Sequence, residues 1–229
     1  ESYRAFVSRW AADAQAWGVD AFSIGVECKS WSWRFGPFWT QLISEIRGVF
    51  KGTLTYSSNW DEVENVLFWD QLDWIGVNAF YPLADSRGAS TARYVERASE
   101  IAGGLESVAR SLAMPVVFLE VGYTSRPDAA VEPWLWPDGM LAVAVDEEEQ
   151  SRALDALTGA VLTRPWLHGF FLWRYYANLD DISQEAAWGF SPHGKLAERT
   201  LSAIFGSRWA VDPELPPWHP PGPSPILHE

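Results

Sequence analysis

The sequence predicts an α/β fold in which a parallel sheet is wrapped by helices. Stretches with helical periodicity alternate with short apolar runs of strand length, which is the order expected of β–α–β units. The first of these runs, residues 21–27, is nearly uninterrupted, as in a parallel strand that is buried on both faces. Two of these runs end in a glutamate, Glu27 and Glu120. We expect the two carboxylates to lie at one edge of the sheet, because the carboxyl ends of parallel strands meet there.

The first predicted unit is a helix over residues 2–17 followed by a strand over residues 21–27. The helix carries an apolar stripe formed by Phe6, Trp10, Ala14 and Trp17. Gly18 follows the stripe and is the residue type that commonly ends a helix. The strand (AFSIGVE) is apolar up to its last residue, Glu27.

The same alternation continues to the end of the globular part. Further helices are predicted at residues 38–50, 61–70, 91–112, 146–162 and 196–205, and further strands at residues 52–59, 73–81, 115–122 and 168–176. The acidic residues 146–149 are interpreted as a helix first turn, where the helix dipole favours negative charge. From Val211 the chain is rich in proline. We therefore predict one domain over residues 1–210 and an extended tail over residues 211–229.

Composition narrows the class of function. A formal net charge of −13 would repel phosphate backbones, so nucleic acid is not an expected partner. No apolar stretch is long enough to span a membrane, and no signal pattern opens the chain, so no compartment is predicted, although secretion or a periplasmic location would suit it. The single cysteine, Cys28, excludes an internal disulfide.

Nucleotide-binding loops, a serine-nucleophile elbow and zinc-ligand spacings are absent from the sequence, and no cofactor or metal is predicted. Asp180 and Asp181 are interpreted as loop-capping residues rather than cation ligands.

Glu27 and Glu120 both emerge from apolar runs, where an unpaired carboxylate is costly to bury. One interpretation is that each is paired with an arginine. The other is that they form a catalytic pair, because cleavage of a glycosidic bond requires one carboxyl group to protonate the leaving oxygen and a second to act at the anomeric carbon. Aromatic residues gather at the same strand ends and can either pack in the core or form sugar platforms. They are Trp60, Tyr81, Tyr123 and Trp173.

Several segments, in order, resemble glycoside hydrolase family 113. They are FSIGVE, FWTQLISEIRGVFKGTLTYSSNW, FWDQLDWIGVNAFYPL, FLEVGYTS with PW shortly after, and GFFLWRYY. The resemblance extends from Ser2 to about Phe205. It implies a retaining (β/α)₈ TIM-barrel enzyme of the endo-β-1,4-mannanase type, which acts on a polysaccharide or oligosaccharide substrate.

The resemblance also implies residue roles. Glu27 would be the acid/base after strand four of the barrel, and Glu120 the nucleophile after strand seven. Tyr81 would hold the nucleophile and Trp173 would form the floor of the subsite for the cleaved sugar. Further substrate contacts are assigned to Asn59, Trp60, Asn78 and Tyr123.

Two departures from the family pattern matter. Many related enzymes have Asn immediately before the acid/base, where it binds the sugar 2-hydroxyl, but Val26 stands there in this chain. This leaves open a retaining hydrolase of another β-glycan, and a catalytically silent sugar-binding barrel is the alternative from a different class. In addition, nothing in the sequence represents strands one to three. We expect a partial barrel covering roughly strands four to eight, with the N-terminal strands supplied by the rest of a longer chain.

Overall fold

The computed structural model describes residues 2–136, 143–176, 178 and 185–211. A five-stranded sheet forms the centre, with the strands in sequence order from β1 to β5 and every neighbouring pair parallel. The strands are β1 (Ala21–Val26), β2 (Thr53–Asn59), β3 (Trp74–Asn78), β4 (Val116–Val121) and β5 (Leu167–Leu172). The predicted α/β class and parallel sheet are therefore confirmed.

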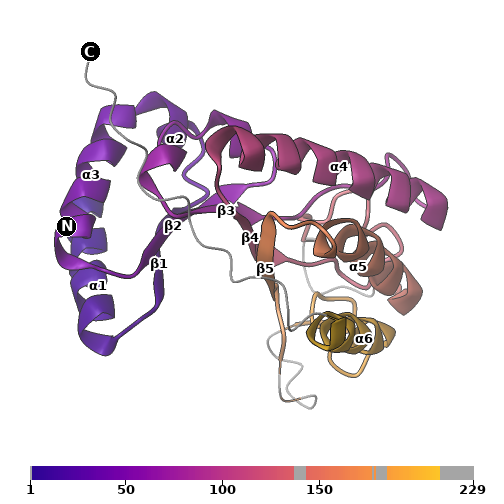
Figure 1. Ribbon diagram of the computed structural model, residues 1–229. Coiled ribbons are helices and arrows are strands. Elements are labelled where there is room, and N and C mark those ends of the chain that lie inside the picture. The colour runs from indigo at the N-terminus through magenta and orange to yellow at the C-terminus, as the bar shows by residue number, and fades with distance from the viewer. Residues whose placement is uncertain (1, 137–142, 177, 179–184, 212–229) are drawn as a thin grey trace.

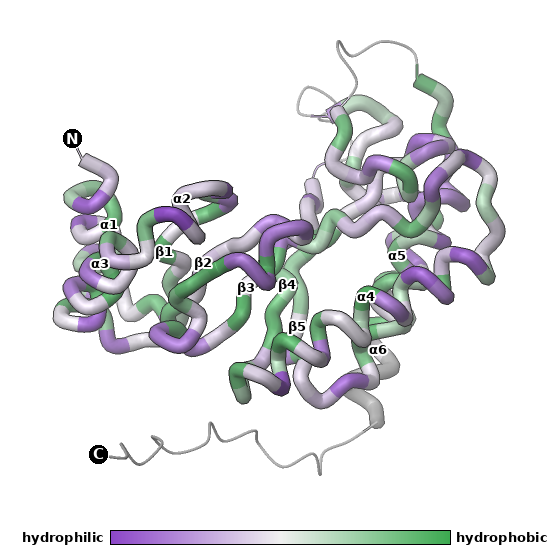
Figure 2. The backbone as a smooth tube through the Cα atoms, turned by 90° about the horizontal axis from the view of Figure 1, so that it is seen from above, coloured by the Kyte–Doolittle hydropathy of each residue, from purple (hydrophilic) through white to green (hydrophobic). Residues whose placement is uncertain are grey.

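Helices lie in an arc outside the sheet, also in sequence order (Figure 1). They are α1 (Tyr3–Trp17), α2 (Ser30–Arg34), α3 (Gly36–Val49), α4 (Thr91–Leu112), α5 (Glu147–Leu162) and α6 (Leu196–Val211). Seen from above, α1 and α3 stand at one end of the row of strands and α5 and α6 at the other (Figure 2). The sheet thus remains open, with β1 and β5 as its two edges.

Local signals explain where several helices begin and end. The side-chain oxygens of Ser2, Ser90 and Asp146 accept hydrogen bonds from the first turns of α1, α4 and α5. Gly18 ends α1 with a φ of 69°, a left-handed conformation that glycine adopts without a steric penalty. The three glutamates after Asp146 occupy the first turn of α5, as predicted.

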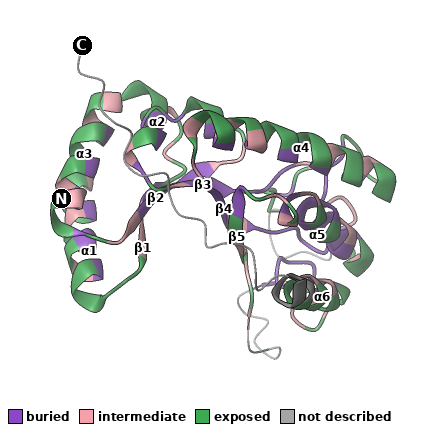
Figure 3. Ribbon diagram, in the orientation of Figure 1, coloured by how far each residue is buried: buried purple, intermediate pink, exposed green. Residues whose placement is uncertain are grey.

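The core lies between the sheet and the helices, where the buried residues concentrate (Figure 3). Trp39 of α3 is fully buried and stacks on Phe68, with ring centroids 4.8 Å apart. Tyr56 of β2 packs edge-on against both rings. This aromatic cluster fixes β2 and the later part of the β2–β3 connection against α3.

Several predicted boundaries were wrong. The expected helix at residues 61–70 is instead two short 3₁₀ turns, Val63–Asn65 and Trp69–Gln71, because Val63 and Trp69 turn inward to the core. The predicted strands at residues 73–81 and 168–176 end earlier, at Asn78 and Leu172. The first strand ends at Val26, so Glu27 is the residue after it. Helix α2 was not predicted, and residues 212–229 of the predicted tail lie outside the described residues.

The apolar stripe predicted for the first helix is not its buried face. Ala14 is buried, together with Val7 and Ala11, but Phe6 is 51% exposed and Trp17 is 69% exposed. The aromatic rings of the stripe contact one another along the helix surface instead, Phe6 against Trp10 and Trp10 against Trp17. Helix α1 therefore presents an exposed aromatic outer face.

Candidate active site

Glu27 is placed by the irregular end of β1. The pairing of β1 with β2 shifts register between Ser23 and Val26, and Glu27 then adopts a φ of 45°. A positive φ is costly for a residue with a Cβ and is found mainly where surrounding structure enforces it. Here the backbone N–H of Glu27 donates to the carbonyl of Ser57 at 2.8 Å, and the next N–H donates to the hydroxyl of Tyr56 at 2.8 Å. These two bonds hold the turn that presents the Glu27 carboxylate.

Glu120 lies near the end of β4, beside the last residue of β3. Asn78 and Glu120 are register partners in the β3–β4 pair, and the N–H of Ala79 donates to the Glu120 carbonyl at 2.6 Å. The side chain of Asn78 extends the other way, with Nδ2 donating to Oε1 of Glu27 at 2.9 Å. Asn78 therefore links the two acids. It contacts Glu120 through the backbone ladder and Glu27 through its side chain. It was predicted to contact substrate, and the structure gives it a carboxylate partner.

The electrostatics of the two acids are coupled. Burial and, next, the negative charge of Glu27 raise the pKa of Glu120 to about 7. Within the described residues, neither Glu27 nor Glu120 takes part in an ion pair with an arginine or lysine. The structure therefore disfavours the interpretation in which each acid is neutralised by an arginine.

Both acids open into one cleft of about 500 Å³ at the carboxyl ends of the strands. Its lining also includes Lys29, Asn59, Phe80, Trp134, Trp136, Trp173, Arg174 and Phe190. Among the predicted site residues, Asn59 and Trp173 are thus brought together with Glu27 and Glu120. Acids and exposed indole rings at one opening can bind a sugar and act on its glycosidic bond.

Three residues that line the cleft were not predicted to be site residues: Trp134, Trp136 and Arg174. The two tryptophans come from the loop after β4 and are 45% and 37% exposed, although a buried position is more usual for this residue type. Arg174 directly follows Trp173 after β5. For two of them the available signal was the family resemblance, since Arg174 lies in GFFLWRYY and Trp134 belongs to the PW that follows FLEVGYTS.

Three predicted aromatic residues lie beside the cleft rather than on it. Trp60 stacks on the cleft residue Trp134, with ring centroids 5.3 Å apart and an angle of 19° between planes. Trp60 and Tyr81 line a separate pocket of about 280 Å³ against α4. Tyr123 is fully buried, and its hydroxyl donates to the carbonyl of Tyr81 at 2.7 Å.

The expected contact between Tyr81 and the nucleophile is not among the hydrogen bonds within the described residues. Burial, followed by the charges of Glu64 and Asp61, raises the pKa of Tyr81. The side chain of Tyr81 thus lines the pocket against α4, together with Glu64 and Asp61. Asp180 and Asp181 lie outside the described residues.

The described part of the chain contains no cluster of three or more His, Cys, Asp or Glu side chains arranged to hold a metal ion. None of its helices is both long enough and apolar enough to cross a membrane.

Comparison with solved structures gives consistent matches to one enzyme family. The family 113 β-mannanase AaManA from Alicyclobacillus acidocaldarius, solved in complex with ManMIm, matches 90% of this chain at 27% identity and a TM-score of 0.77. Two further structures of family 113 β-1,4-mannanases match 90% of this chain at 28% and 29% identity, with TM-scores of 0.74 and 0.72. This chain spans 61–62% of the length of those three structures. The fold is therefore a partial barrel of the kind those enzymes contain.

Comparison by sequence gives the family itself. No curated protein matches the chain. The description of Glycoside Hydrolase Family 113 matches residues 1–195, which is most of the sequence and includes both strand-end acids. The chain belongs to glycoside hydrolase family 113.

Proposed function

We propose that this chain carries the catalytic carboxylates of a retaining glycoside hydrolase that cleaves β-1,4-linked mannan at internal glycosidic bonds. The observation that carries the proposal is the pair Glu27 and Glu120, which line one cleft closely enough for the charge of Glu27 to raise the pKa of Glu120. A pair of interacting carboxyl groups is the minimum that hydrolysis of a glycosidic bond requires. Mannan is proposed because three solved structures at 27–29% identity are described as β-mannanases.

In the proposed mechanism, Glu120 attacks the anomeric carbon while Glu27 donates its proton to the leaving oxygen. The glycosidic bond breaks and a covalent glycosyl–Glu120 ester forms. Glu27, now ionised, takes a proton from water, and the resulting hydroxide equivalent displaces Glu120 from the anomeric carbon. The product keeps its configuration because the carbon is inverted twice.

The proton distribution in the cleft bears on these roles. In the empty cleft, burial and Glu27 favour the protonated form of Glu120, whereas attack requires Glu120 to be ionised. The reactive form therefore has the proton of the pair on Glu27. The developing positive charge of the sugar in the transition state stabilises the Glu120 anion. The sugar therefore favours the form in which Glu120 is ionised and Glu27 holds the proton.

The indole rings of the cleft support a sugar polymer as ligand. Trp134, Trp136 and Trp173 are between 37% and 45% exposed, an unusual state for so large an apolar surface. Exposed aromatic faces are suited to the apolar faces of sugar rings. The rings come from the loops after β4 and β5, so they wall one side of the cleft that Glu27 and Glu120 enter.

A different β-glycan is the second candidate, and Val26 is the observation that favours it. Val26 is 55% exposed at the end of β1, immediately before Glu27, and its side chain offers no donor or acceptor to a sugar hydroxyl. Discrimination at the 2-hydroxyl, which differs in orientation between mannose and glucose, must then come from other groups.

We also propose that additional polypeptide completes the barrel. The sheet has five strands in a fold that closes with eight, and β1 presents an unpaired edge. Helix α1 lies beside this edge (Figure 1), and its aromatic face is exposed. Strands that precede β1 in the barrel order would pair with the edge and cover those rings.

The test is release of reducing ends from β-1,4-mannan, β-1,4-glucan and peptidoglycan by the full-length protein. The proposal expects mannan to be cleaved at internal bonds and Glu120→Ala to abolish cleavage. Cleavage of glucan or peptidoglycan in place of mannan would select the second candidate. Undiminished hydrolysis by Glu120→Ala would overturn the mechanism, and binding without hydrolysis by the unmodified protein would show a silent barrel.

A further inference from the structure

Arg174 is a cation held on the wall of the candidate cleft. It follows Trp173 after β5, and both residues line the cleft with the two acids. The centre of its guanidinium lies 5.7 Å from the ring centroid of Trp136, 5.6 Å from that of Trp173 and 5.2 Å from that of Tyr176. Its side chain is nevertheless 37% exposed. Three aromatic rings therefore fix the position of a charge that a ligand in the cleft can reach.

The charge of Arg174 does not serve the catalytic carboxylates. The causes that shift the pKa of Glu120 are burial and the charge of Glu27, and both raise it. An arginine placed to neutralise Glu120 would lower that pKa. Arg174 therefore acts on a different part of the cleft, in the subsite walled by Trp136 and Trp173.

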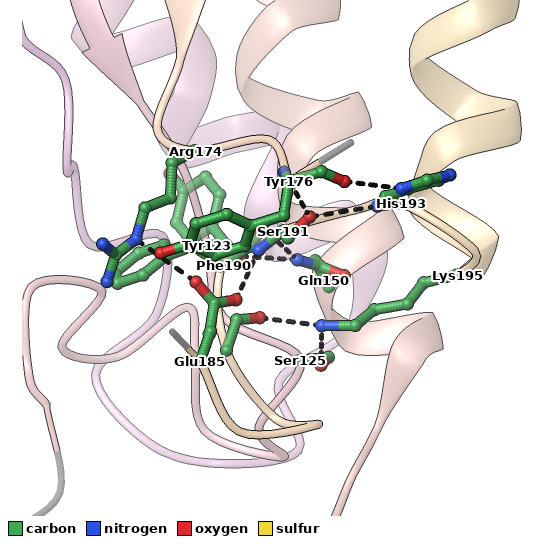
Figure 4. Close-up of polar contacts among 11 residues, drawn as sticks. Tyr123, Ser125, Gln150, Arg174, Tyr176, Glu185, Phe190, Ser191, His193 and Lys195 are labelled. Atoms are coloured by element: carbon green, nitrogen blue, oxygen red, sulfur yellow. Dashed lines mark hydrogen bonds and ion pairs between the residues drawn. The ribbon is translucent and has the colours of Figure 1, made fainter. Parts of the chain in front are cut away.

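Glu185 is the ion-pair partner of Arg174. Oε2 of Glu185 lies 3.3 Å from Nε of Arg174, and Oε1 accepts a hydrogen bond from the backbone N–H of Ser191 at 2.6 Å. Figure 4 shows the two terminal nitrogens of Arg174 on the side of the guanidinium turned away from Glu185. The edge with two parallel N–H donors is thus left for a ligand, which is the edge that pairs with a carboxylate.

Glu185 neutralises Arg174 only in part, because it is shared. Lys195 also acts on Glu185, while its Nζ donates to Oγ of Ser125 at 2.9 Å and to the carbonyl of Gly189 at 3.0 Å (Figure 4). Burial raises the pKa of Glu185, which weakens its ability to act as a counterion. The wall of the cleft near Arg174 thus keeps positive character in a protein whose net charge is −13.

We propose that Arg174 binds a carboxylate on the glycan, so that the preferred substrate carries an acidic sugar or an acidic substituent in the subsite walled by Trp136 and Trp173. The inference rests on the proposed hydrolysis of a β-glycan in this cleft and specifies the glycan further. A guanidinium fork matches the two oxygens of a carboxylate, and aromatic rings beside it exclude water from the pair. Lys29, which also lines the cleft, adds a second positive charge.

The first experiment compares hydrolysis of three β-1,4-linked oligosaccharides of equal length by the full-length protein: neutral mannose units, one mannuronate unit, and one pyruvate acetal. Cleavage of an acidic oligosaccharide in preference to the neutral one is expected, and the two acidic arms distinguish an acidic sugar from an acidic substituent. Arg174→Gln should reduce kcat/KM for the preferred acidic oligosaccharide more than for the neutral one, so that the ratio of the two values falls by on the order of tenfold or more. Equal losses on neutral and acidic oligosaccharides would overturn the proposal.

Matched variants separate charge recognition from structural damage. Arg174→Lys keeps the charge but not the fork, so it should retain part of the preference. Arg174→Gln combined with Glu185→Gln avoids leaving a buried carboxylate without its partner, and should show the same selective loss. Arg34→Gln is the control, because Arg34 also lies over an indole ring, 4.6 Å from the centroid of Trp33, but does not line the cleft. An equal loss in Arg34→Gln would count against Arg174.

A binding measurement keeps this inference separate from the proposed hydrolysis. Titration of the acidic oligosaccharides into full-length Glu120→Gln by calorimetry should show binding that weakens with salt and is lost in the double variant with Arg174→Gln. If the unmodified protein hydrolyses nothing while this Arg174-dependent binding is present, the proposed function fails and the inference stands. If mannan is hydrolysed and no acidic oligosaccharide binds better than the neutral one, the inference fails alone.

Discussion

Nδ2 of Asn78 donates a hydrogen bond of 2.9 Å to Oε1 of Glu27. The same residue pairs with Glu120 in the β3–β4 ladder, so it stands between the two acids of the cleft. Its Oδ1 is buried and has no hydrogen-bond partner among the described residues. Asn78 is therefore the side chain through which the geometry of the proposed catalytic pair can be tested most directly.

Replacing Asn78 by alanine removes the donor that orients Glu27. A hydrogen bond to a charged group contributes about 1.5–3 kcal/mol, so we expect kcat/KM to fall by roughly 10–100-fold with the fold retained. Steady-state kinetics on β-1,4-mannan, with circular dichroism as the control for folding, provide the measurement. Asn78→Asp would instead add a third carboxylate beside the pair and should move the acidic limb of the pH profile to higher pH. Unchanged kinetics in both variants would show that Asn78 does not position Glu27.

Glu27→Gln should lower the pKa of Glu120. The charge of Glu27 is one of the two causes that raise this pKa to about 7, and the substitution removes it. Burial, the larger cause, remains, so the pKa should stay above the ordinary value of 4.5. Titration of the carboxyl carbon by ¹³C NMR in selectively labelled protein would measure the change. An unchanged pKa would mean that the two acids do not interact.

Glu120→Gln should stabilise the protein above pH 7 more than at acidic pH. Because the folded-state pKa of Glu120 is raised, folding is favoured while the group is protonated, and this advantage is lost as the pH rises from about 4.5 to about 7. Glutamine carries no charge at any pH and escapes the loss. The difference in Tm between variant and unmodified protein should therefore be larger at pH 8 than at pH 4, by on the order of 2–4 °C. Differential scanning calorimetry at the two pH values tests this, and an equal difference at both would contradict it.

Gly122→Ala should displace Trp173 from the cleft. A Cβ at this position would lie 2.0 Å from the backbone carbonyl oxygen of Trp173, so the segment after β5 has to move. We expect a loss of about 1–3 kcal/mol in stability and a higher KM. Gly103→Ala is the matched control, since its Cβ would meet nothing within 4 Å in the middle of α4 and should gain about 0.5–1 kcal/mol. A raised KM in Gly103→Ala, or an unchanged KM in Gly122→Ala, would show that KM does not depend on the position of Trp173.

Trp17→Glu tests whether the aromatic face of α1 is covered in the full-length protein. In residues 1–229 expressed alone, the 69% exposed ring favours association, so the substitution should increase the monomer fraction in sedimentation velocity. In the full-length protein, the same substitution should lower Tm, because a charge would replace an apolar ring against the added strands and helices. An unchanged Tm of the full-length protein would show that no additional segment covers Trp17.

The strands that precede both acids could be predicted from the sequence because apolar runs such as AFSIGV and VVFLEV mark buried parallel strands. The direction of individual side chains could not. Glu27 takes its orientation from a register shift and a positive φ, neither of which leaves a signal in AFSIGVE. Tyr81 was predicted to be the last residue of a strand, but the chain leaves the ladder at Asn78 and Tyr81 lines the pocket against α4.

The remaining site residues lie in long connections, where sequence patterns carry little information about position. Trp134 and Trp136 belong to a loop between β4 and α5, and only contacts across the fold place them, such as the stack of Trp134 on Trp60. The segment at residues 61–70 has helical spacing, but ten residues form a marginal helix in water and burial of Trp69 outweighs it.

The strict sequence order of the strands also has a consequence for how activity arises during biosynthesis. Each strand pairs only with its neighbours in the chain, so the sheet can grow by local steps as the polypeptide leaves the ribosome. Glu27 is delivered with the first of the five strands, but it gains Asn78 only with the third and Glu120 only with the fourth. A growing chain thus acquires its complete pair of acids late, after most of the scaffold that holds them has formed.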